Sequence, residues 1–288
     1  GVADIATARH AVAEGHVDLI GMTRAHMADP YLVAKLTRGA ETRIRPCVGL
    51  GYCVDRVNQG KAAVCGHNAA TGREAVMPHL IPRADTHKKV AVVGGGPAGL
   101  EAARVAAQRG HAVTVLEAAD QPGGQILLAS QNPRRRELLS IIDWRMQQCL
   151  DAGVDFQFNT WAEAGDVAAN APDAVIIATG GMAQTDLFEN GNELVVSTWD
   201  IISGDVKPGT NVLLFDDGGD HAALQAAETI AKSGAKLEFM GPDRNISPDV
   251  MGMNLTPYMR ELQPLGVTFT MAHRLVGVAR DGNQLTAH

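Results

Sequence analysis

The sequence predicts an α/β protein with parallel sheets, and three observations predict this class. Residues 89–104 read as a short apolar strand, a run of three glycines and a helix-forming segment. Residues 211–240 read as strand, helix and strand. Residues 4–38 read as helix, strand and helix, an alternation that is typical of parallel α/β structure.

Length and composition limit the classes of protein. The 288 residues suffice for about two domains. The chain is 45% apolar and 20% charged, and no apolar run approaches the ~20 residues of a membrane span. The formal net charge of -7, from 25 basic and 32 acidic residues, argues against a nucleic-acid surface. We therefore expect neither nucleic acid nor a membrane as partner.

The cysteines suggest the cellular compartment, and the two ends of the chain suggest that it is part of a longer protein. Four cysteines do not make a disulfide framework in a chain of this length, and no signal peptide is visible, so we expect the cytoplasm. The basic cluster Arg134–Arg136 reads as a solvated helix start, with a phosphate or acidic partner as the alternative. The chain begins without methionine and ends soon after a turn signal at 281–283. We therefore suspect a fragment of a longer protein.

The first forty residues alternate between the two kinds of element. Asp4 to Glu14 predicts a helix because its apolar residues recur at helical spacing. Val17–Gly21 predicts a buried strand, and Pro30 to Arg38 predicts a second helix. A single strand cannot bury itself, so its neighbours must come from elsewhere.

Three cysteines follow on a loop rich in glycine. Residues 45–53 read Arg-Pro-Cys-Val-Gly-Leu-Gly-Tyr-Cys, and Cys65 follows after eleven more residues. Such loops let several thiolates converge, as iron-sulfur binding requires. Zinc is disfavoured, because neither a fourth cysteine nor a histidine pair stands at the usual spacing. Cys149 lies on a patterned helix at 135–152 and fits a buried apolar side chain.

The segments 21–24 (Gly-Met-Thr-Arg) and 27–30 (Met-Ala-Asp-Pro), with the cysteine loop, resemble the Old Yellow Enzyme-like NADH:flavin oxidoreductase family. Its members include trimethylamine dehydrogenase, histamine dehydrogenase, dimethylglycine and N-methylproline demethylases and 2,4-dienoyl-CoA reductase. The resemblance implies that residues 1–44 are the end of a (β/α)8 flavin barrel and that the chain is a C-terminal fragment. It also implies that Arg24 binds the FMN phosphate, backed by Gly21, which suits a guanidinium fork. The alternative is a surface arginine at a strand end.

The resemblance also assigns the cysteines of residues 45–87. The family pattern is Cys-x2-Cys, two or three residues, Cys, about eleven or twelve residues, Cys, and it ligates a [4Fe-4S] cluster. Cys47, Cys53 and Cys65 match the first, third and fourth positions, while the second falls on Leu50, which cannot ligate iron. Three explanations stay open: a substitute ligand such as His67, a [3Fe-4S] centre, or a loop without a cluster. The prolines and charges of 78–88 then predict a linker.

Residues 88–200 are predicted as a Rossmann-like nucleotide-binding domain. Gly94, Gly96 and Gly99 fit G-x-G-x-x-G, which provides a tight turn, close approach of a pyrophosphate, and helix-strand packing. The helix N-terminus after them favours phosphate. A second strand, 112–117, ends on Glu117, where a ribose hydroxyl needs an acceptor. The alternative is an ordinary strand-to-helix turn.

Two later segments extend this nucleotide set. Residues 120–125 resemble the second glycine-bearing loop of disulfide-oxidoreductase-like proteins, and residues 175–181 resemble the strand and turn that close the same site. They contribute Gly124, Gln125, Thr179 and Gly180 as cofactor-binding candidates. The resemblance implies FAD, or ADP alone, as the ligand.

Residues 201–288 are predicted as a second, incomplete nucleotide-binding-like domain. The segments 211–215 and 235–240 predict strands, and 221–233 predicts a helix between them. The turn at 216–221 reads Asp-Asp-Gly-Gly-Asp-His, with three carboxylates where a pyrophosphate would lie. Each would repel the anion by on the order of 1 kcal/mol or more. We expect a turn that binds no dinucleotide, with a cation or water as the alternatives.

These features predict the C-terminal part of an iron-sulfur flavoprotein oxidoreductase. An amine or N-methyl amino acid dehydrogenase or demethylase is favoured, which passes electrons from FMN to an acceptor such as an electron-transferring flavoprotein. One alternative is an NAD(P)H-dependent enoate or 2,4-dienoyl-CoA reductase, and another is a nucleotide-binding electron-transfer module without catalysis of its own. We expect a small-molecule substrate and, at full length, a homo-oligomer. The sequence identifies no catalytic acid or base.

Overall fold

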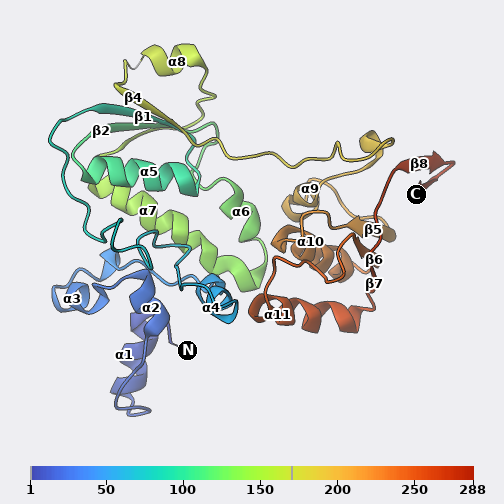
Figure 1. The fold of residues 1–288 in the computed structure, drawn as a ribbon, viewed down its shortest axis with the longest axis horizontal. Helices are drawn as coiled ribbons and strands as arrows, with labels where there is room; N and C mark the ends of the chain where they lie inside the picture. The colour runs from blue at the N-terminus through green and yellow to red at the C-terminus, as the bar shows by residue number, and fades with distance from the viewer. Residues whose placement is uncertain (1, 170) are drawn as a thin grey trace. The chain divides into compact units, whose positions relative to one another are not determined.

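The computed structural model describes residues 2–169 and 171–288, which form two compact units, Gly1–Gly180 and Gly181–His288 (Figure 1). The boundary between the units falls inside the predicted domain 88–200, and the predicted boundaries at 44, 87 and 200 stay predictions. Within the described ranges, no helix has both the length and the apolar character to cross a bilayer.

Short helices make up the first part of unit 1. The helix predicted at 4–14 is confirmed, and it begins at Ile5 because the Asp4 carboxylate accepts the backbone N–H of Thr7 at 2.8 Å. The helix predicted at 30–38 is also present, shortened at both ends. The helices of this part are α1 Ile5–Ala13, α2 Thr23–Ala28, α3 Leu32–Thr37, the 3-10 helix η1 Glu41–Arg43, and α4 Tyr52–Asn58.

The predicted strand Val17–Gly21 is wrong. Its segment is irregular, with Val17 42% exposed and Leu19 90% exposed. Residues 2–88 contain no β-strand, so the backbone of this segment has no neighbouring ladder to pair with. Apolar composition alone therefore did not make a strand here, and the predicted barrel end stays an expectation drawn from the resemblance.

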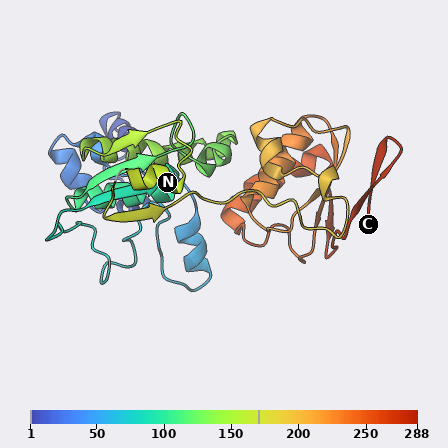
Figure 2. The ribbon, with the colours of Figure 1, turned by 90° about the horizontal axis from the view of Figure 1, so that it is seen from above.

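A four-stranded parallel sheet in the order β3-β2-β1-β4 forms the rest of unit 1. The central strand β1 is buried because helices α5 and α7, which pack on each other, cover a face of the sheet (Figures 1 and 2). Val92, Val115 and Cys149 lie fully buried between them. The elements are β1 Lys89–Val93, α5 Pro97–Gln108, β2 Ala112–Leu116, α6 Gln125–Ala129, η2 Pro133–Leu138, α7 Leu139–Asp151, β3 Asp155–Gln157, α8 Ala164–Ala169 and β4 Ala174–Ile177.

Unit 2 is built on a smaller parallel sheet in the order β5-β6-β7. Helix α10 buries Leu224 and Ile230 against Phe239 of β6, and α11 adds Leu262 to this core. The strands and helix predicted at 211–240 are confirmed, and the turn signal at 281–283 joins the hairpin β8-β9. The elements are η3 Asn192–Leu194, α9 Thr198–Ser203, β5 Asn211–Phe215, α10 His221–Lys232, β6 Lys236–Gly241, α11 Gly252–Leu262, η4 Gln263–Leu265, β7 Thr268–Met271, β8 Val278–Asp281 and β9 Gln284–Ala287.

Candidate iron-sulfur and nucleotide sites

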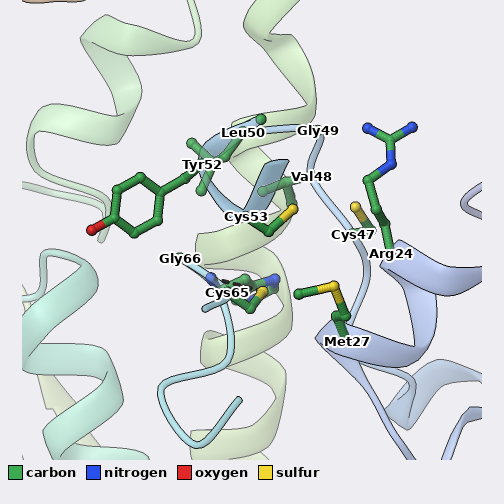
Figure 3. A pocket seen from close by; sticks show the side chains of 12 residues that line it. Arg24, Met27, Cys47, Val48, Gly49, Leu50, Tyr52, Cys53, Cys65 and Gly66 are labelled. Atoms are coloured by element: carbon green, nitrogen blue, oxygen red, sulfur yellow. Dashed lines mark hydrogen bonds between the residues drawn. The ribbon is translucent and has the colours of Figure 1, made fainter. Parts of the chain in front are cut away.

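Three cysteines and an arginine meet in one pocket of unit 1, which we call the cysteine pocket (Figure 3). Cys47 lies in the extended segment after η1, Cys53 in the first turn of α4, and Cys65 in the loop after α4. All three are half-buried free thiols, and Arg24 of α2 lines the same pocket. Gly21 is exposed, precedes α2 and is not among the lining residues. Four of these five predicted site residues therefore share one pocket.

Two glycines allow the chain to turn between the first two cysteines. Gly49 has φ +66° and Gly51 has φ +78°, a left-handed conformation that glycine adopts without the steric cost of a Cβ. Val48, beside Cys47, is buried in an apolar cluster with Leu100 of α5. The loop is thereby anchored on the helix that follows the glycine-rich loop.

Hydrogen bonds hold α2 to the chain on both sides of the cysteines. Asn68 donates from its side-chain amide to the carbonyl oxygen of Ala28 at 3.0 Å. The buried carboxylate of Asp29 accepts the backbone N–H of Arg45 at 2.8 Å. Because Asp29 directly follows α2, these bonds fix the arginine-bearing helix against the cysteine loop.

The thiols of the pocket repel one another when ionised. Burial raises the pKa of the Cys53 thiol, and the charges of Cys47 and Cys65 raise it further, while the Arg24 guanidinium acts in the opposite direction. Several thiolates can coexist in such a space only with a compensating cation, and a metal provides one.

Leu50 occupies the position where the family pattern has its second cysteine. Its side chain packs against the apolar cluster of Val48 and Leu100. Its Cδ1 also lies 2.6 Å from the position that a Cβ on Gly66 would take, so a larger residue beside Cys65 would require the Leu50 side chain to move. Leu50 thus fills space in the loop and offers no donor atom.

His67 is a further polar side chain of the pocket and is 1% exposed. Its Nδ1 lies 2.9 Å from the carbonyl oxygen of Pro46, and its ring meets Trp144 edge-on with centroids 5.5 Å apart. Burial lowers the pKa of His67 to about 3, and the charge of Arg145 lowers it as well. The imidazole is therefore neutral at ordinary pH.

The described residues contain no group of three or more His, Cys, Asp or Glu side chains that could hold a metal ion. An iron-sulfur cluster makes a different demand, because its thiolates bind separate irons of one inorganic core and do not converge on a single ion. Three free thiols around one pocket fit this demand, and they do not fit a mononuclear site.

A buried ionic network that the sequence analysis missed lies behind the pocket. Glu101 of α5 accepts from Arg104 at 2.6 Å and from Arg145 of α7 at 2.9 Å. Arg145 also donates to the carbonyl oxygen of His67 at 3.1 Å. The spacing of Glu101 and Arg104, three residues apart on a helix, was the available sequence signal, whereas Arg145 carried none. We call Glu101, Arg104 and Arg145 the arginine network.

The glycine-rich loop after β1 has the close contacts that its glycines predict. Gly94 has φ +105°, and a Cβ there would collide with the backbone of Ala178. A Cβ on Gly99 would collide with the carbonyl oxygen of Gly94, so both positions require glycine. Gly96 instead has no atom within 4 Å of its Cβ position, which leaves space at the N-terminus of α5. That open space suits a phosphate group.

The remaining nucleotide candidates border this loop. The Glu117 carboxylate accepts the backbone N–H groups of Gly95 and Ala119. Gly124 stands against Gly96, with its Cβ position 3.3 Å from the Gly96 Cα. The Cβ position of Gly180 is 3.7 Å from the side-chain nitrogen of Gln125, and Thr179 lies beside Gly94. The structure brings the predicted residues together, and their assignment to a nucleotide stays a prediction.

The corresponding turn of unit 2 is satisfied by its own carboxylates. Buried Asp216 accepts the backbone N–H of Gly219 at 2.8 Å and the Ser247 hydroxyl at 2.7 Å. Asp220 caps α10 by accepting the N–H of Ala222 at 2.7 Å. Burial raises the pKa of Asp216, and the charge of Asp220 raises it further. The backbone N–H groups of Gly219 and Ala222, which a phosphate could otherwise use, are therefore already engaged.

Comparison with known proteins gives consistent matches. A protein-family model described as an NAD(P)-binding Rossmann-like domain matches residues 92–147. The chain is 64% identical over 287 residues to a probable N-methylproline demethylase from Rhizobium meliloti (strain 1021), covering 100% of this chain and 42% of that protein. It is 45% identical over 282 residues to an N,N-dimethylglycine/sarcosine dehydrogenase from Chromohalobacter salexigens, covering 95% of this chain and 41% of that protein.

Solved structures extend the likeness to the fold. A 2-naphthoyl-CoA reductase in complex with 2-naphthoyl-CoA is 32% identical, with a TM-score of 0.86 over 98% of this chain and 43% of that one. The chain thus spans about two fifths of the length of these two relatives and of this structure.

Proposed function

Since the chain belongs to the Old Yellow Enzyme-like family of flavin-dependent dehydrogenases, demethylases and reductases, we propose that its protein oxidises an N-methylated amino acid or amine. The observation that carries the proposal is the meeting of Cys47, Cys53 and Cys65 with Arg24 in one pocket. The names of the two relatives, an N-methylproline demethylase and a dimethylglycine/sarcosine dehydrogenase, support the substrate class.

Each site of unit 1 has a residue set for one cofactor. Arg24 would bind the FMN phosphate, with Gly21 beside it, and the three cysteines would bind an iron-sulfur cluster. Gly94, the open position at Gly96, and Glu117 would bind FAD or ADP, with Gly99, Gly124, Gln125, Thr179 and Gly180 shaping the site. When bound, FMN accepts a hydride or its equivalent from a substrate, and the cluster carries single electrons.

The chain's own residues hold these groups in place. Asp29 and Asn68 fix α2, and therefore Arg24, against the loop that carries the cysteines. Val48 anchors the same loop on α5, whose N-terminus would bind the phosphates of the nucleotide. The arginine that would bind the FMN phosphate and the cysteines that would bind the cluster therefore lie on segments that hydrogen bonds hold together. We propose an electron-transferring flavoprotein as the acceptor, a homo-oligomeric full-length protein, and the cytoplasm as its compartment.

The acidic turn of unit 2 favours oxidation of an amine over reduction by NAD(P)H. Asp216 and Asp220 engage the backbone N–H groups of Gly219 and Ala222. A dinucleotide would have to displace those bonds and bring its pyrophosphate next to two carboxylates. Electrons are therefore expected to enter from the substrate.

Anaerobic stopped-flow spectroscopy on the full-length protein tests this direction. N-methylproline, dimethylglycine and sarcosine are mixed separately with the oxidised protein, and flavin absorbance is followed. At least one of these should bleach the flavin, whereas NADH and NADPH should leave it oxidised. Bleaching by a nicotinamide and not by any N-methyl amino acid would overturn the proposal.

An NAD(P)H-dependent enoate or dienoyl-CoA reductase is the second candidate. Unit 2 retains the strand, turn and helix order of a nucleotide-binding unit in β5, α10 and β6, and this observation favours it. The likeness to 2-naphthoyl-CoA reductase supports it too. In the same experiment this candidate predicts rapid bleaching by NADH or NADPH and reoxidation by an enoyl-CoA.

A further inference from the structure

One histidine that lines the cysteine pocket has a buried ring nitrogen without a hydrogen-bond partner among the described residues. The Nε2 atom of His67 has no hydrogen-bond partner among the described residues, although the side chain is 1% exposed. Polar atoms this deeply buried normally have a partner, so an unsatisfied ring nitrogen on a residue that lines a pocket points to a ligand in that pocket. His67 lines the same pocket as Cys47, Cys53 and Cys65.

The hydrogen bond at the other ring nitrogen fixes which nitrogen can coordinate. Nδ1 lies 2.9 Å from the carbonyl oxygen of Pro46, which can only accept, so Nδ1 carries the proton. Nε2 of the neutral ring then presents a lone pair. Metal-binding histidines commonly donate their second N–H to a backbone carbonyl in this way, which fixes the ring and its tautomer.

The surroundings of His67 hold the ring and the neighbouring thiolate together. The backbone N–H of His67 points to the sulfur of Cys65 at 3.4 Å. The carbonyl oxygen of His67 accepts from Arg145, which Glu101 holds in turn. The main chain of His67 is thereby held on both sides, and its ring is fixed through Nδ1 without help from a ligand.

We propose that Nε2 of His67 is the fourth ligand of an iron-sulfur cluster held by Cys47, Cys53 and Cys65. Leu50 stands where a second cysteine would be expected, offers no donor, and points its side chain into apolar packing. His67, which lines the same pocket, would supply the missing bond. Because imidazole is neutral where thiolate is anionic, this replacement raises the reduction potential of the cluster relative to four thiolates. The inference rests on the proposed iron-sulfur function.

Isotope labelling tests the bond without any substitution. The full-length protein is purified anaerobically from cells fed ¹⁵N-histidine, its iron and sulfide are measured, and the reduced cluster is studied by pulsed EPR. A directly coordinated imidazole should give a strong nitrogen coupling that changes with the isotope. A cluster without such a coupling would overturn the histidine ligand and leave the proposed function standing. Absence of iron and sulfide would overturn both.

Two substitutions of His67 and one control substitution test whether the nitrogen coupling comes from His67. His67→Cys should keep a four-iron cluster, lose the nitrogen coupling, and lower the midpoint potential. His67→Gln should lose iron toward a three-iron centre or a colourless protein. The control His26→Gln changes an exposed histidine whose Nδ1 also meets a backbone carbonyl, that of Met22, and it should change neither spectrum nor potential.

The thermal midpoint and the flavin content of each variant show whether it has folded. If His67→Gln unfolds, His67→Cys and the labelled wild type still decide the question. An unchanged nitrogen coupling in folded His67→Cys would overturn the proposal.

Discussion

The four cysteines differ in what surrounds their sulfur atoms. Cys149 is fully buried in the sheet-helix core, and its thiol donates to the carbonyl oxygen of Leu100 at 3.5 Å. Burial raises its pKa to about 12, so almost no thiolate forms at neutral pH. Cys47, Cys53 and Cys65 are half-buried around a pocket. Chemical reactivity should therefore divide the cysteines into one inert and three accessible residues.

Iodoacetamide labelling followed by peptide mass spectrometry measures this division. In metal-free protein at pH 8, the three pocket cysteines should be alkylated, and Cys149 should react at least about a hundredfold more slowly. Addition of denaturant should remove the difference. Rapid alkylation of Cys149 in the folded protein would contradict its burial.

The arginine network makes a single carboxylate important for stability. Burial acts to raise the pKa of Glu101, but the hydrogen bond and charge of Arg104, together with Arg145 and Arg45, outweigh it and lower the pKa to about 2. A depressed folded-state pKa means that the stabilisation is present above the unfolded value of 4.5 and is lost as the pH falls through about 2.

Glu101→Gln leaves two buried guanidinium groups without a counter-charge, so the free energy of unfolding at pH 7 should fall by about 3–5 kcal/mol. Below pH 4.5 the Glu101 carboxylate of the unfolded wild type takes up a proton while that of the folded protein stays ionised down to about pH 2, so the difference in unfolding free energy should narrow at pH 3. Urea denaturation of the wild type and the variant at both pH values measures this difference in unfolding free energy. Glu137→Gln, at an exposed position of η2, is the matched control and should have little effect. An equal loss at both pH values would contradict the electrostatic explanation.

At the scale of elements, the glycines of the G-x-G-x-x-G loop have two different roles, one in packing the helix on the strand and one in leaving space for a ligand. Gly99 has no room for a Cβ because the carbonyl oxygen of Gly94 lies against it, whereas Gly96 faces open space in an ordinary extended conformation. One glycine is required for the fold, and the other leaves space for a ligand.

Alanine substitutions should reveal this difference. Gly99→Ala should lower the free energy of unfolding of the nucleotide-free protein by roughly 1–3 kcal/mol, because the helix must move away from the strand. Gly96→Ala should leave that stability nearly unchanged and weaken ADP binding. Thermal melts and calorimetric titration with ADP give the two quantities. Equal destabilisation by both substitutions would contradict the separation of roles.

Local patterns predicted the elements better than they predicted the pocket. Strands β1, β2 and β5 and helix α10 follow from apolar runs and glycine turns, which act over a few residues. The strand expected at 17–21 failed because pairing depends on a neighbour that a local pattern does not reveal. The arginine network joins residues 44 positions apart, and the His67 contact with Arg145 spans 78. Only the tertiary fold shows such contacts.

At the scale of the whole molecule, the segments present in this chain determine whether it can bind cofactors and whether it can catalyse the reaction by itself. A flavin barrel requires eight strands, and residues 2–88 contain none. The cysteine pocket and the glycine-rich loop of unit 1 are nevertheless both formed. The chain should therefore bind cofactors without catalysing the oxidation.

The 288-residue polypeptide, purified anaerobically, should bind ADP but should oxidise neither N-methylproline nor sarcosine with an artificial electron acceptor. The full-length protein, assayed in parallel, should do so. Measurable turnover by the shorter polypeptide would show that the reacting groups lie within these residues.

Trp144 stands where the cysteine loop meets the arginine network. The guanidinium carbons of Arg45 and Arg104 lie 4.3 and 5.3 Å from the centre of its ring, and its indole N–H donates to the carbonyl oxygen of Arg43 at 3.2 Å. An iron-sulfur cluster in the adjacent pocket would absorb the emission of Trp144, so loading of the proposed cluster should lower the fluorescence of this residue. Trp161, which is 82% exposed, should emit at longer wavelength. Trp144 would then report optically whether the cluster is bound.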